Sequence, residues 1–324
     1  MGEASGSRRD FGEETTAAEV VEGIDLAGKR AVVTGASGGL GAETARALAS
    51  RGAEVTLSAR DVPKARKVVD EIRASTGNAG VDVMELHLDR PASVRDFASA
   101  YRASHDAFDL LVNNAGIMAC PLERTAEGWE LQFATNHLGH FLLTGLLAPL
   151  LRPGARVVSV SSRGHRFSPV VFEDIHFEMR SYDKWEAYGQ SKTANVLLAV
   201  ELDRRLRERG VRAFALHPGA IVTELGRHLK PEDIEELQSR APGGIVWKPV
   251  PAGAATSVWA ATAPELEGRG GIYLEDCHVA RPRRGDDDSE GFAAWAVDPE
   301  AAARLWSVSE ETLGESFDLA GARG

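Results

Sequence analysis

Short apolar runs rich in β-branched residues alternate with longer amphipathic stretches along most of this chain. The apolar runs are "RAVVTG", "EVTLSA", "VDVMELHL", "FDLLVNNAG", "ARVVSVSS", "VRAFALHPG" and "GIYLEDC". Between them lie stretches with helical periodicity, among them Leu40–Ser50, Val62–Ala74 and Glu127–Leu151. Strands that alternate with helices predict an α/β fold, with a doubly wound parallel sheet of about seven strands and helices on both faces.

This alternation defines a single domain over residues 28–281 and leaves two flanking segments. Residues 1–27 are polar and predict a flexible extension. Residues 282–324 form a tail in which Asp298 and Pro299 predict the start of a helix that packs on the domain. Inside the domain, residues 163–185 and 219–250 break the pattern after the carboxyl ends of strands. Open parallel sheets bind ligands there, so both stretches are expected to form the substrate pocket.

Composition narrows the class of protein. A hydrophobic content of 43% can form a core, and a formal net charge of -11 argues against nucleic acid as a partner. The two cysteines, Cys120 and Cys277, form no C-x-x-C motif, which favours a reducing compartment and excludes zinc sites of the usual type. His137 and His140 could mimic a metal pair but lack a third ligand, so no metal is expected. No signal peptide and no run of ~18 apolar residues is present, which predicts a soluble, cytoplasmic protein.

The first strand ends in a glycine-rich turn, "TGASGGLGAETA", from which a helix begins at once. Free N–H groups at a helix start and side-chain-free backbone together suit a nucleotide diphosphate. The residues predicted to hold it are Gly35, Ser37, Gly38, Gly39, Leu40 and Gly41. The turn does not match G-x-G-x-x-G, so on its own it also fits a plain strand-to-helix connection.

A second stretch, "EAYGQSKTANV", places Tyr188 and Lys192 one helical turn apart on the same face. An ammonium can then lie within a few ångströms of a phenol. Taken alone, the pair is also typical of an ordinary surface contact, so its meaning depends on the rest of the chain.

Five motifs occur in a characteristic order, and together they resemble the short-chain dehydrogenase/reductase family over residues from about 28 to 280. They are T-G-x-x-x-G-x-G at Thr34–Gly41, N-N-A-G at Asn113–Gly116, the serines Ser161 and Ser162, Y-x-x-x-K at Tyr188, and P-G at Pro218. "NHLGHFLLT", "SSRGHRF", "AYGQSKTANVLLAVEL", "LHPGAIVTELGRH" and "DPEAAARLWSVSEE" are similar to the retinol-dehydrogenase-like branch, as is the long gap between Ser162 and Tyr188. The resemblance implies a Rossmann-type fold and hydride transfer between a nicotinamide and a carbonyl carbon.

The resemblance also implies four catalytic roles. Tyr188 is the general acid/base, and Ser162 polarises the substrate oxygen, with Ser161 as the structural alternative. Lys192 holds the nicotinamide ribose and lowers the pKa of Tyr188, by at most about three units for an ammonium ~4 Å away at an effective dielectric of ~20. Asn136 anchors a water of the proton path, while a helix-kink or capping role stays open for this amide.

The end of the second strand bears on cofactor choice. An enzyme that uses NAD needs an acidic side chain there, which bonds the ribose 2′-OH. In this chain Arg60 follows Ala59, and a guanidinium suits the 2′-phosphate of NADP. NADP(H) is therefore favoured over NAD(H). Asp61 could serve as the acid, but its position before Pro63 suits a helix cap. Further cofactor-binding residues implied by the resemblance are Leu88, Asp89, Asn114, Ala115, Gly116, Tyr188, Lys192, Pro218, Gly219, Ile221 and Thr223, with helix capping as the alternative for Asp89.

These observations predict an NADP(H)-dependent oxidoreductase that interconverts an alcohol and a carbonyl on an apolar small molecule. The alternatives are a catalytically silent NADP(H)-binding regulatory protein, and an epimerase or dehydratase that acts through a transient keto intermediate. The helical stretches 127–151 and 188–209 are apolar enough to mediate a homodimer or homotetramer, although the core of one chain can also account for them. Substrate identity and physiological direction stay open.

Overall fold

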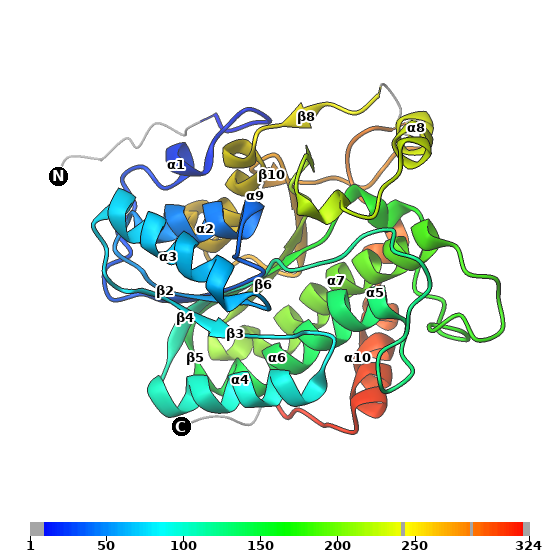
Figure 1. The fold of residues 1–324 in the computed structure, drawn as a ribbon, viewed down its shortest axis with the longest axis horizontal. Helices are drawn as coiled ribbons and strands as arrows, with labels where there is room; N and C mark the ends of the chain where they lie inside the picture. The colour runs from blue at the N-terminus through cyan, green and yellow to red at the C-terminus, as the bar shows by residue number, and fades with distance from the viewer. Residues whose placement is uncertain (1–9, 241–243, 286–287, 320–324) are drawn as a thin grey trace.

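A mostly parallel sheet between two layers of helices forms the body of the computed structural model, which describes residues 10–240, 244–285 and 288–319 (Figure 1). The eight strands run in the order β10-β9-β6-β5-β4-β1-β2-β3. They are β1 (Arg30–Thr34), β2 (Glu54–Ala59), β3 (Val81–Glu85), β4 (Phe108–Asn113), β5 (Leu151–Val160), β6 (Arg212–Leu216), β9 (Ile272–Glu275) and β10 (His278–Val279). The predicted parallel sheet with helices on both faces is confirmed.

The strand number differs from the expected seven because of β10. This strand pairs antiparallel with β9 at the sheet edge, through His278 opposite Glu275 and Val279 opposite Leu274. Two residues are too few to produce a visible hydrophobic period, so the sequence pattern did not reveal it. A separate pair, β7 (Ala220–Ile221) and β8 (Trp247–Lys248), lies in the segment between β6 and β9.

Helices cover the two faces of the sheet and enclose one apolar core on each side. In Figure 1 the layer with α1, α2, α3 and α9 lies on one face, and the layer with α4, α6 and α7 lies on the other. The helices are α1 (Ala17–Val20), α2 (Gly39–Ala49), α3 (Val62–Thr76), α4 (Pro91–Ser104), α5 (Leu131–Phe133), α6 (Gly139–Leu147), α7 (Lys184–Leu206), α8 (Pro231–Arg240), α9 (Val250–Thr262) and α10 (Pro299–Leu313). Short 3-10 turns are η2 (Ala148–Leu150), η3 (Arg163–Arg166), η4 (Arg207–Arg209), η5 (Glu224–Gly226), η6 (Pro264–Leu266) and η7 (Ala294–Val297).

The continuous helix expected over Glu127–Leu151 is wrong in two respects. The helix begins at Leu131, because the Glu130 carboxylate caps it by accepting the N–H groups of Gln132 at 2.9 Å and Phe133 at 2.7 Å. A π-helix, η1 (Ala134–Leu138), then separates α5 from α6. Such a π segment inserts an extra residue into the helical ladder and often marks a functional position.

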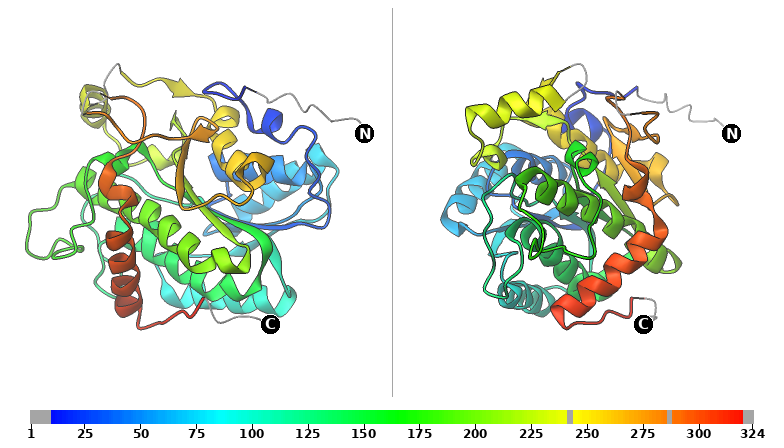
Figure 2. Two further views of the ribbon diagram at one scale, coloured as in Figure 1. Left: turned by 180° about the vertical axis from the view of Figure 1, so that it is seen from behind. Right: turned by 90° about the vertical axis from the view of Figure 1, so that its right-hand side faces the viewer.

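Both flanking segments contribute described helices. In the N-terminal segment, α1 has a capping box at Thr16, buries Ala17 and Val20, and packs against α9. In the tail, Asp298 accepts the N–H of Glu300 at 2.9 Å and starts α10, which packs along α7 (Figure 2). The chain itself therefore covers part of the helical surface considered above for association. Within the described ranges, no helix combines the length and apolar character needed to span a bilayer.

Candidate active site

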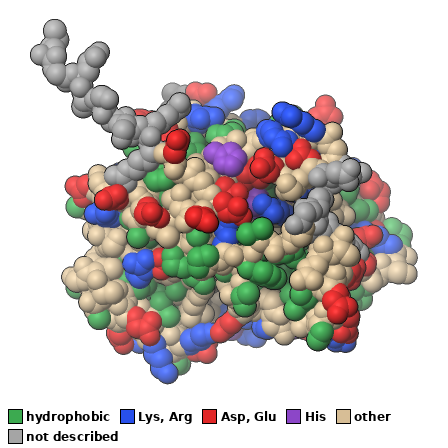
Figure 3. Space-filling view, turned by 90° about the horizontal axis from the view of Figure 1, so that it is seen from above, with side chains coloured by type: hydrophobic (Ala, Val, Ile, Leu, Met, Phe, Trp, Pro, Cys, Tyr) green, Lys and Arg blue, Asp and Glu red, His purple; other side chains and the backbone are tan. Residues whose placement is uncertain are grey.

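A cavity of about 1330 Å³ opens at the carboxyl ends of the parallel strands. Its wall includes residues just after β1, β2, β4, β5 and β6, namely Gly35, Arg60, Asn114, Ser161 and Pro218. The segment after β6, with β7, β8 and α8, covers it from above, and on this outer face acidic, basic and apolar side chains are interspersed (Figure 3).

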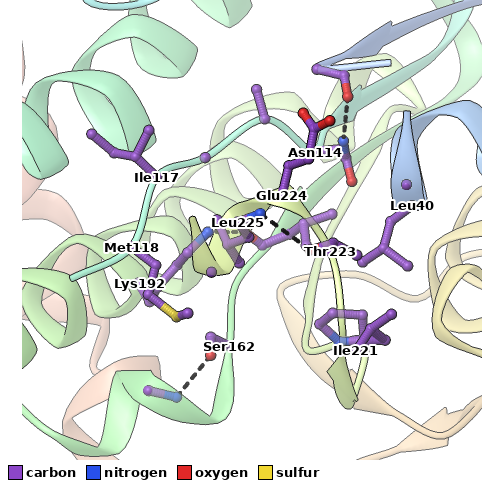
Figure 4. Close-up of a pocket in the computed structure, with 18 of the residues that line it drawn as sticks. Leu40, Asn114, Ile117, Met118, Ser162, Lys192, Ile221, Thr223, Glu224 and Leu225 are labelled. Carbon is purple, nitrogen blue, oxygen red and sulfur yellow. Dashed lines mark hydrogen bonds between the residues drawn. The ribbon is translucent and has the colours of Figure 1, made fainter. Parts of the chain in front are cut away.

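All residues predicted to bind the cofactor line this one cavity. They are Gly35, Ser37, Gly38, Gly39, Leu40, Gly41, Arg60, Leu88, Asp89, Asn114, Ala115, Gly116, Tyr188, Lys192, Pro218, Gly219, Ile221 and Thr223. Figure 4 shows Asn114, Lys192 and Ser162 arranged around the same space as Leu40 and Ile221, which come from separate segments.

The glycine turn is packed too closely for side chains. A Cβ at Gly41 would lie 2.6 Å from Asn114 Nδ2 and 2.6 Å from the Gly35 carbonyl oxygen, and Gly35 itself has a φ of +66°. Asn114 Nδ2 donates to the Thr34 carbonyl at 2.8 Å, which joins the turn to the N-N-A-G motif. Gly38 provides no side-chain cap for α2, so the first N–H groups of this helix stay free for an anionic group at the cavity.

Positive charge gathers at the end of the cavity near β2. Arg60, Lys64 and Arg227 line it, and Glu224 forms an ion pair with Lys64 across the opening. Burial lowers the pKa of Arg227, and the positive charge of Arg60 also lowers it. Both residues line the cavity. Arg227 lies far from Arg60 in sequence, and no local motif revealed it.

Of the two acidic residues considered for this end of the cavity, one caps a helix and the other lines the cavity. Asp61 accepts the N–H of Lys64 at 2.9 Å and caps α3, as its sequence context predicted. Asp89 lines the cavity instead of capping α4, whose N-cap residue is Arg90 and has no side-chain cap bond.

The two adjacent serines after β5 have different partners. The Ser161 hydroxyl donates to the Lys192 carbonyl at 2.7 Å and thereby fastens α7 to the sheet. Ser162 Oγ accepts the N–H of Gly164 at 3.0 Å and lies at the cavity (Figure 4). Tyr188 lines the same cavity. This arrangement leaves Ser162 as the serine whose hydroxyl is available to a bound molecule.

Tyr188 and Lys192 are not a surface pair, because their exposed fractions are only 3% and 2%. Burial raises the pKa of Tyr188 to about 12, against a lowering effect of its hydrogen bond with Ser162. Burial also lowers the pKa of Lys192 to about 8. The expected lowering of the Tyr188 pKa by Lys192 is therefore wrong in this structure: desolvation of the phenol dominates, and Lys192 Nζ donates to the Val160 carbonyl at 3.1 Å, 5.7 Å from the Tyr188 ring centre.

Asn136 lies in the π-helix and stands behind the cavity wall. Its Oδ1 accepts the N–H of Ile117 at 2.9 Å, and its Nδ2 donates to the Ile117 carbonyl at 3.0 Å and to Ser191 Oγ at 2.9 Å. A Cβ at Gly116 would lie 3.2 Å from Asn136 Oδ1 and 3.4 Å from Lys192 Nζ, so both polar atoms face Gly116. Asn136 thus lies in an irregular part of the helix, and its side chain and that of Lys192 both face Gly116.

His137 and His140 have separate partners. His137 Nε2 bonds with Ser309 Oγ of α10 at 2.8 Å. His140 bonds through Nε2 with Thr34 Oγ1 at 2.8 Å and through Nδ1 with the Asn136 carbonyl at 2.9 Å. Each ring therefore joins two elements of the scaffold.

His165 links Ser162 to the C-terminal tail, a connection that sequence reasoning missed. The ring is fully buried, its Nδ1 donates to the Ser162 carbonyl at 2.6 Å, and its Nε2 accepts the N–H of Ala293 at 3.1 Å. Burial lowers the pKa of His165 to about 3, so the ring is neutral with its proton on Nδ1. The His165 carbonyl accepts bonds from Thr193 at 2.9 Å and Trp295 Nε1 at 3.3 Å. The histidine is visible in "SSRGHRF", but its tail partner lies too far along the chain to be inferred.

Comparison with known proteins adds independent support. A sequence model described as "short chain dehydrogenase" matches residues 29–233. A "Probable oxidoreductase" of Streptomyces antibioticus is 49% identical over 300 residues, which cover 90% of this chain and 99% of that protein. Human "Retinol dehydrogenase 12" is 42% identical over 295 residues, which cover 90% of this chain and 88% of that protein.

Solved structures show the same likeness. The crystal structure of an uncharacterised protein from Mycobacterium paratuberculosis has a TM-score of 0.72 and 36% identity, covering 94% of this chain and 99% of that one. A short chain dehydrogenase of Burkholderia cenocepacia, solved in complex with NADP, has a TM-score of 0.63 and 26% identity, covering 77% and 96%. The resemblance seen in the motifs is confirmed: this chain belongs to the short-chain dehydrogenase/reductase family of oxidoreductases, with retinol dehydrogenases among its relatives.

Proposed function

We propose that this protein is an NADP(H)-dependent oxidoreductase that interconverts an alcohol and a carbonyl on a small molecule with an apolar body. One observation carries this proposal: Ser162, Tyr188, Lys192 and the glycine turn line a single cavity. A nucleotide held at the turn and a carbonyl held at Ser162 would then meet beside the tyrosine.

The chain's own groups stabilise and protonate the substrate oxygen. When bound, NADPH would supply the hydride for the carbonyl carbon, and the substrate oxygen would then gain negative charge. Ser162 Oγ donates a hydrogen bond to this oxygen, and Tyr188 gives it a proton. Because burial raises the pKa of Tyr188 to about 12, the phenol keeps its proton at neutral pH and acts as an acid. Lys192 offers a positive charge beside this path and a donor for the cofactor ribose.

The substrate half of the cavity supports an apolar ligand body. Its wall includes the side chains of Phe167, Trp185, Leu225, Leu229, Ile234, Leu237 and Trp247. Trp185 Nε1 donates to Glu236 at 3.0 Å, and Lys184 pairs with Asp233, so α8 is tied to the start of α7 above this wall.

The preference for NADP(H) rests on Arg60 and Arg227, which line the same cavity, because guanidinium groups match a 2′-phosphate. The relative solved with NADP is in keeping with this preference. Arg60→Ala should raise KM for NADPH by ~10-fold or more and leave KM for NADH nearly unchanged. Equal effects on the two cofactors would contradict the assignment.

Tyr188→Phe tests the catalytic proposal. The variant keeps the ring and loses the proton donor, so kcat should fall by ~100-fold or more while NADPH affinity stays within about twofold. NADPH oxidation with a panel of aldehydes and ketones is the measurement. A variant that retains kcat would refute the role of Tyr188. NADPH binding without turnover of any carbonyl would indicate a silent binding protein, and turnover without net NADPH loss an epimerase or dehydratase.

A further inference from the structure

Arg163 directly follows Ser162 and lines the cavity. Its side chain makes no hydrogen bond or ion pair with any residue in the described part of the chain, and its Nε is buried without a partner. A buried donor without an acceptor lowers the stability of the folded protein. A bound molecule that accepts a hydrogen bond from Arg163 would remove this cost. Arg163 and Ser162, the residue of the expected carbonyl site, line the same cavity.

Neighbouring charges make this part of the cavity positive. Arg166 and Arg283 line it together with Arg163. Burial, together with the charges of Arg283 and Arg163, lowers the pKa of Arg166 to about 10. Arg166 has a structural role, since it donates to the carbonyls of Ser289 at 3.0 Å and Gly291 at 2.5 Å.

Two described acidic residues near this cluster, Glu275 and Asp288, already have partners. Glu275 accepts bonds from His217 Nε2 at 3.2 Å and from the N–H of Gly291 at 2.9 Å. Asp288 forms an ion pair with Arg281 at 2.5 Å. Among the residues that the structure describes, no carboxylate forms an ion pair with Arg163, although the chain carries a net charge of -11.

The missing anion is better assigned to the substrate than to the cofactor. The features suited to cofactor phosphates, the glycine turn and Arg60, follow β1 and β2, whereas Arg163 follows β5 beside Ser162 and Gly164. A planar carboxylate can accept two parallel bonds from one guanidinium, which makes it the matching chemistry.

We propose that the substrate is an amphipathic oxo acid or hydroxy acid, and that Arg163 is the specificity-determining residue that binds its carboxylate. This inference rests on the function proposed above. The carbonyl lies at Ser162 and Tyr188, the apolar body contacts Phe167 and Trp185, and the carboxylate bonds to Arg163. In reduction, the carbonyl gains a hydride from NADPH and a proton from Tyr188, giving the hydroxy acid and NADP⁺, and solvent restores the tyrosine proton.

Matched substrates test the proposal. We suggest a series of ω-oxo carboxylic acids of increasing chain length, each paired with its methyl ester, with NADPH oxidation as the readout. For the best chain length, kcat/KM of the acid should exceed that of the ester by ~10-fold or more. Arg163→Gln should remove this difference, because it should raise KM for the acid far more than KM for the ester. Arg163→Lys should recover part of the preference for the acid, because lysine keeps the positive charge but cannot donate two parallel hydrogen bonds to one carboxylate.

Controls separate this proposal from its rivals. Arg66→Gln removes an exposed arginine that pairs with Asp82 outside the cavity, and should leave the acid preference unchanged. If the wild-type protein reduces acids and esters equally well, the anionic substrate is refuted while the oxidoreductase function stands. If Arg163→Gln raises KM for NADPH instead, the guanidinium serves the cofactor and the inference is wrong. If no carbonyl in any series is reduced although NADPH binds, the proposed function itself fails.

Discussion

Gly164 offers a test of the active-site geometry that alters no catalytic group. A Cβ at this position would lie 2.7 Å from Cε1 and 2.9 Å from Cδ1 of Tyr188, and 3.3 Å from Ser162 Oγ. Carbon atoms in contact normally lie ~3.5–4.0 Å apart. The φ of Gly164 is not positive, so alanine is compatible with the backbone, and the perturbation consists of the clash with the Tyr188 ring and the tight contact with Ser162 Oγ.

The size of the effect follows from these distances. The Tyr188 ring must move by roughly 0.8 Å, or η3 must move away from α7 by the same amount. The ring has little free space because the side chain is 3% exposed. A displacement of ~1 Å at a reacting group can cost ~100-fold in rate, and overpacking of a core costs ~1–3 kcal/mol. We expect Gly164→Ala to lower kcat by ~10–100-fold and the melting temperature by a few degrees, roughly 2–4 °C per kcal/mol.

The assay is NADPH oxidation with an accepted carbonyl, combined with thermal unfolding and NADPH titration. NADPH affinity should stay within about twofold, because the glycine turn after β1 is untouched. Gly12→Ala is the matched control, since a Cβ there meets no atom within 4 Å. A Gly164→Ala variant that folds and retains kcat within twofold of the wild type would show that the position of the Tyr188 ring does not limit the reaction.

Three further predictions concern the same site. Lys192→Met should raise the free energy of unfolding without added cofactor at pH 7 by at most roughly 3 kcal/mol, because burial lowers the pKa of Lys192 from 10.5 to about 8 and penalises the charged form. Between pH 8 and pH 10, Lys192 should raise the wild-type free energy of unfolding by roughly 1 kcal/mol per pH unit, because the unfolded chain binds more protons than the folded chain in this range. Urea unfolding across this pH range should show that the variant loses this slope. His165→Ala should lower kcat by ~10-fold with little change in KM for NADPH, and His165→Asn should recover part of it, because its amide can still donate to the Ser162 carbonyl. Ser162→Ala should lose ~100-fold or more in kcat at unchanged stability, whereas Ser161→Ala should lose ~1 kcal/mol of stability with its bond to Lys192 and keep most of kcat.

Each of these predictions has a contradicting result. An unchanged pH slope in Lys192→Met would mean that the lysine is not desolvated in the folded chain. Equal loss of kcat in His165→Ala and His165→Asn would exclude the bond to Ser162 as the cause. A Ser161→Ala variant as inactive as Ser162→Ala would remove the distinction between the two hydroxyls.

The sequence determined the features that depend on local spacing. The alternation of β-branched strands with helices gave the parallel sheet, because backbone pairing and apolar burial follow from these short-range patterns. The order of the glycine turn, Ser162, Tyr188 and Pro218 indicated residues that all line one cavity, since the carboxyl ends of parallel strands meet at one edge of a sheet. The cap at Asp298 was visible for the same local reason.

Only the tertiary structure decided what depends on long-range contact and burial. The direction of the Tyr188 pKa shift could not be read from the spacing to Lys192, because it depends on how completely the chain removes water from the phenol. Arg227 and Arg60 line one cavity, and the N–H of Ala293 bonds to His165, although no local sequence pattern relates these segments. The sequence "SSRGHRF" did not reveal that Arg163 lines the cavity with no partner among the described residues, because whether a charge is satisfied depends on every element packed around it.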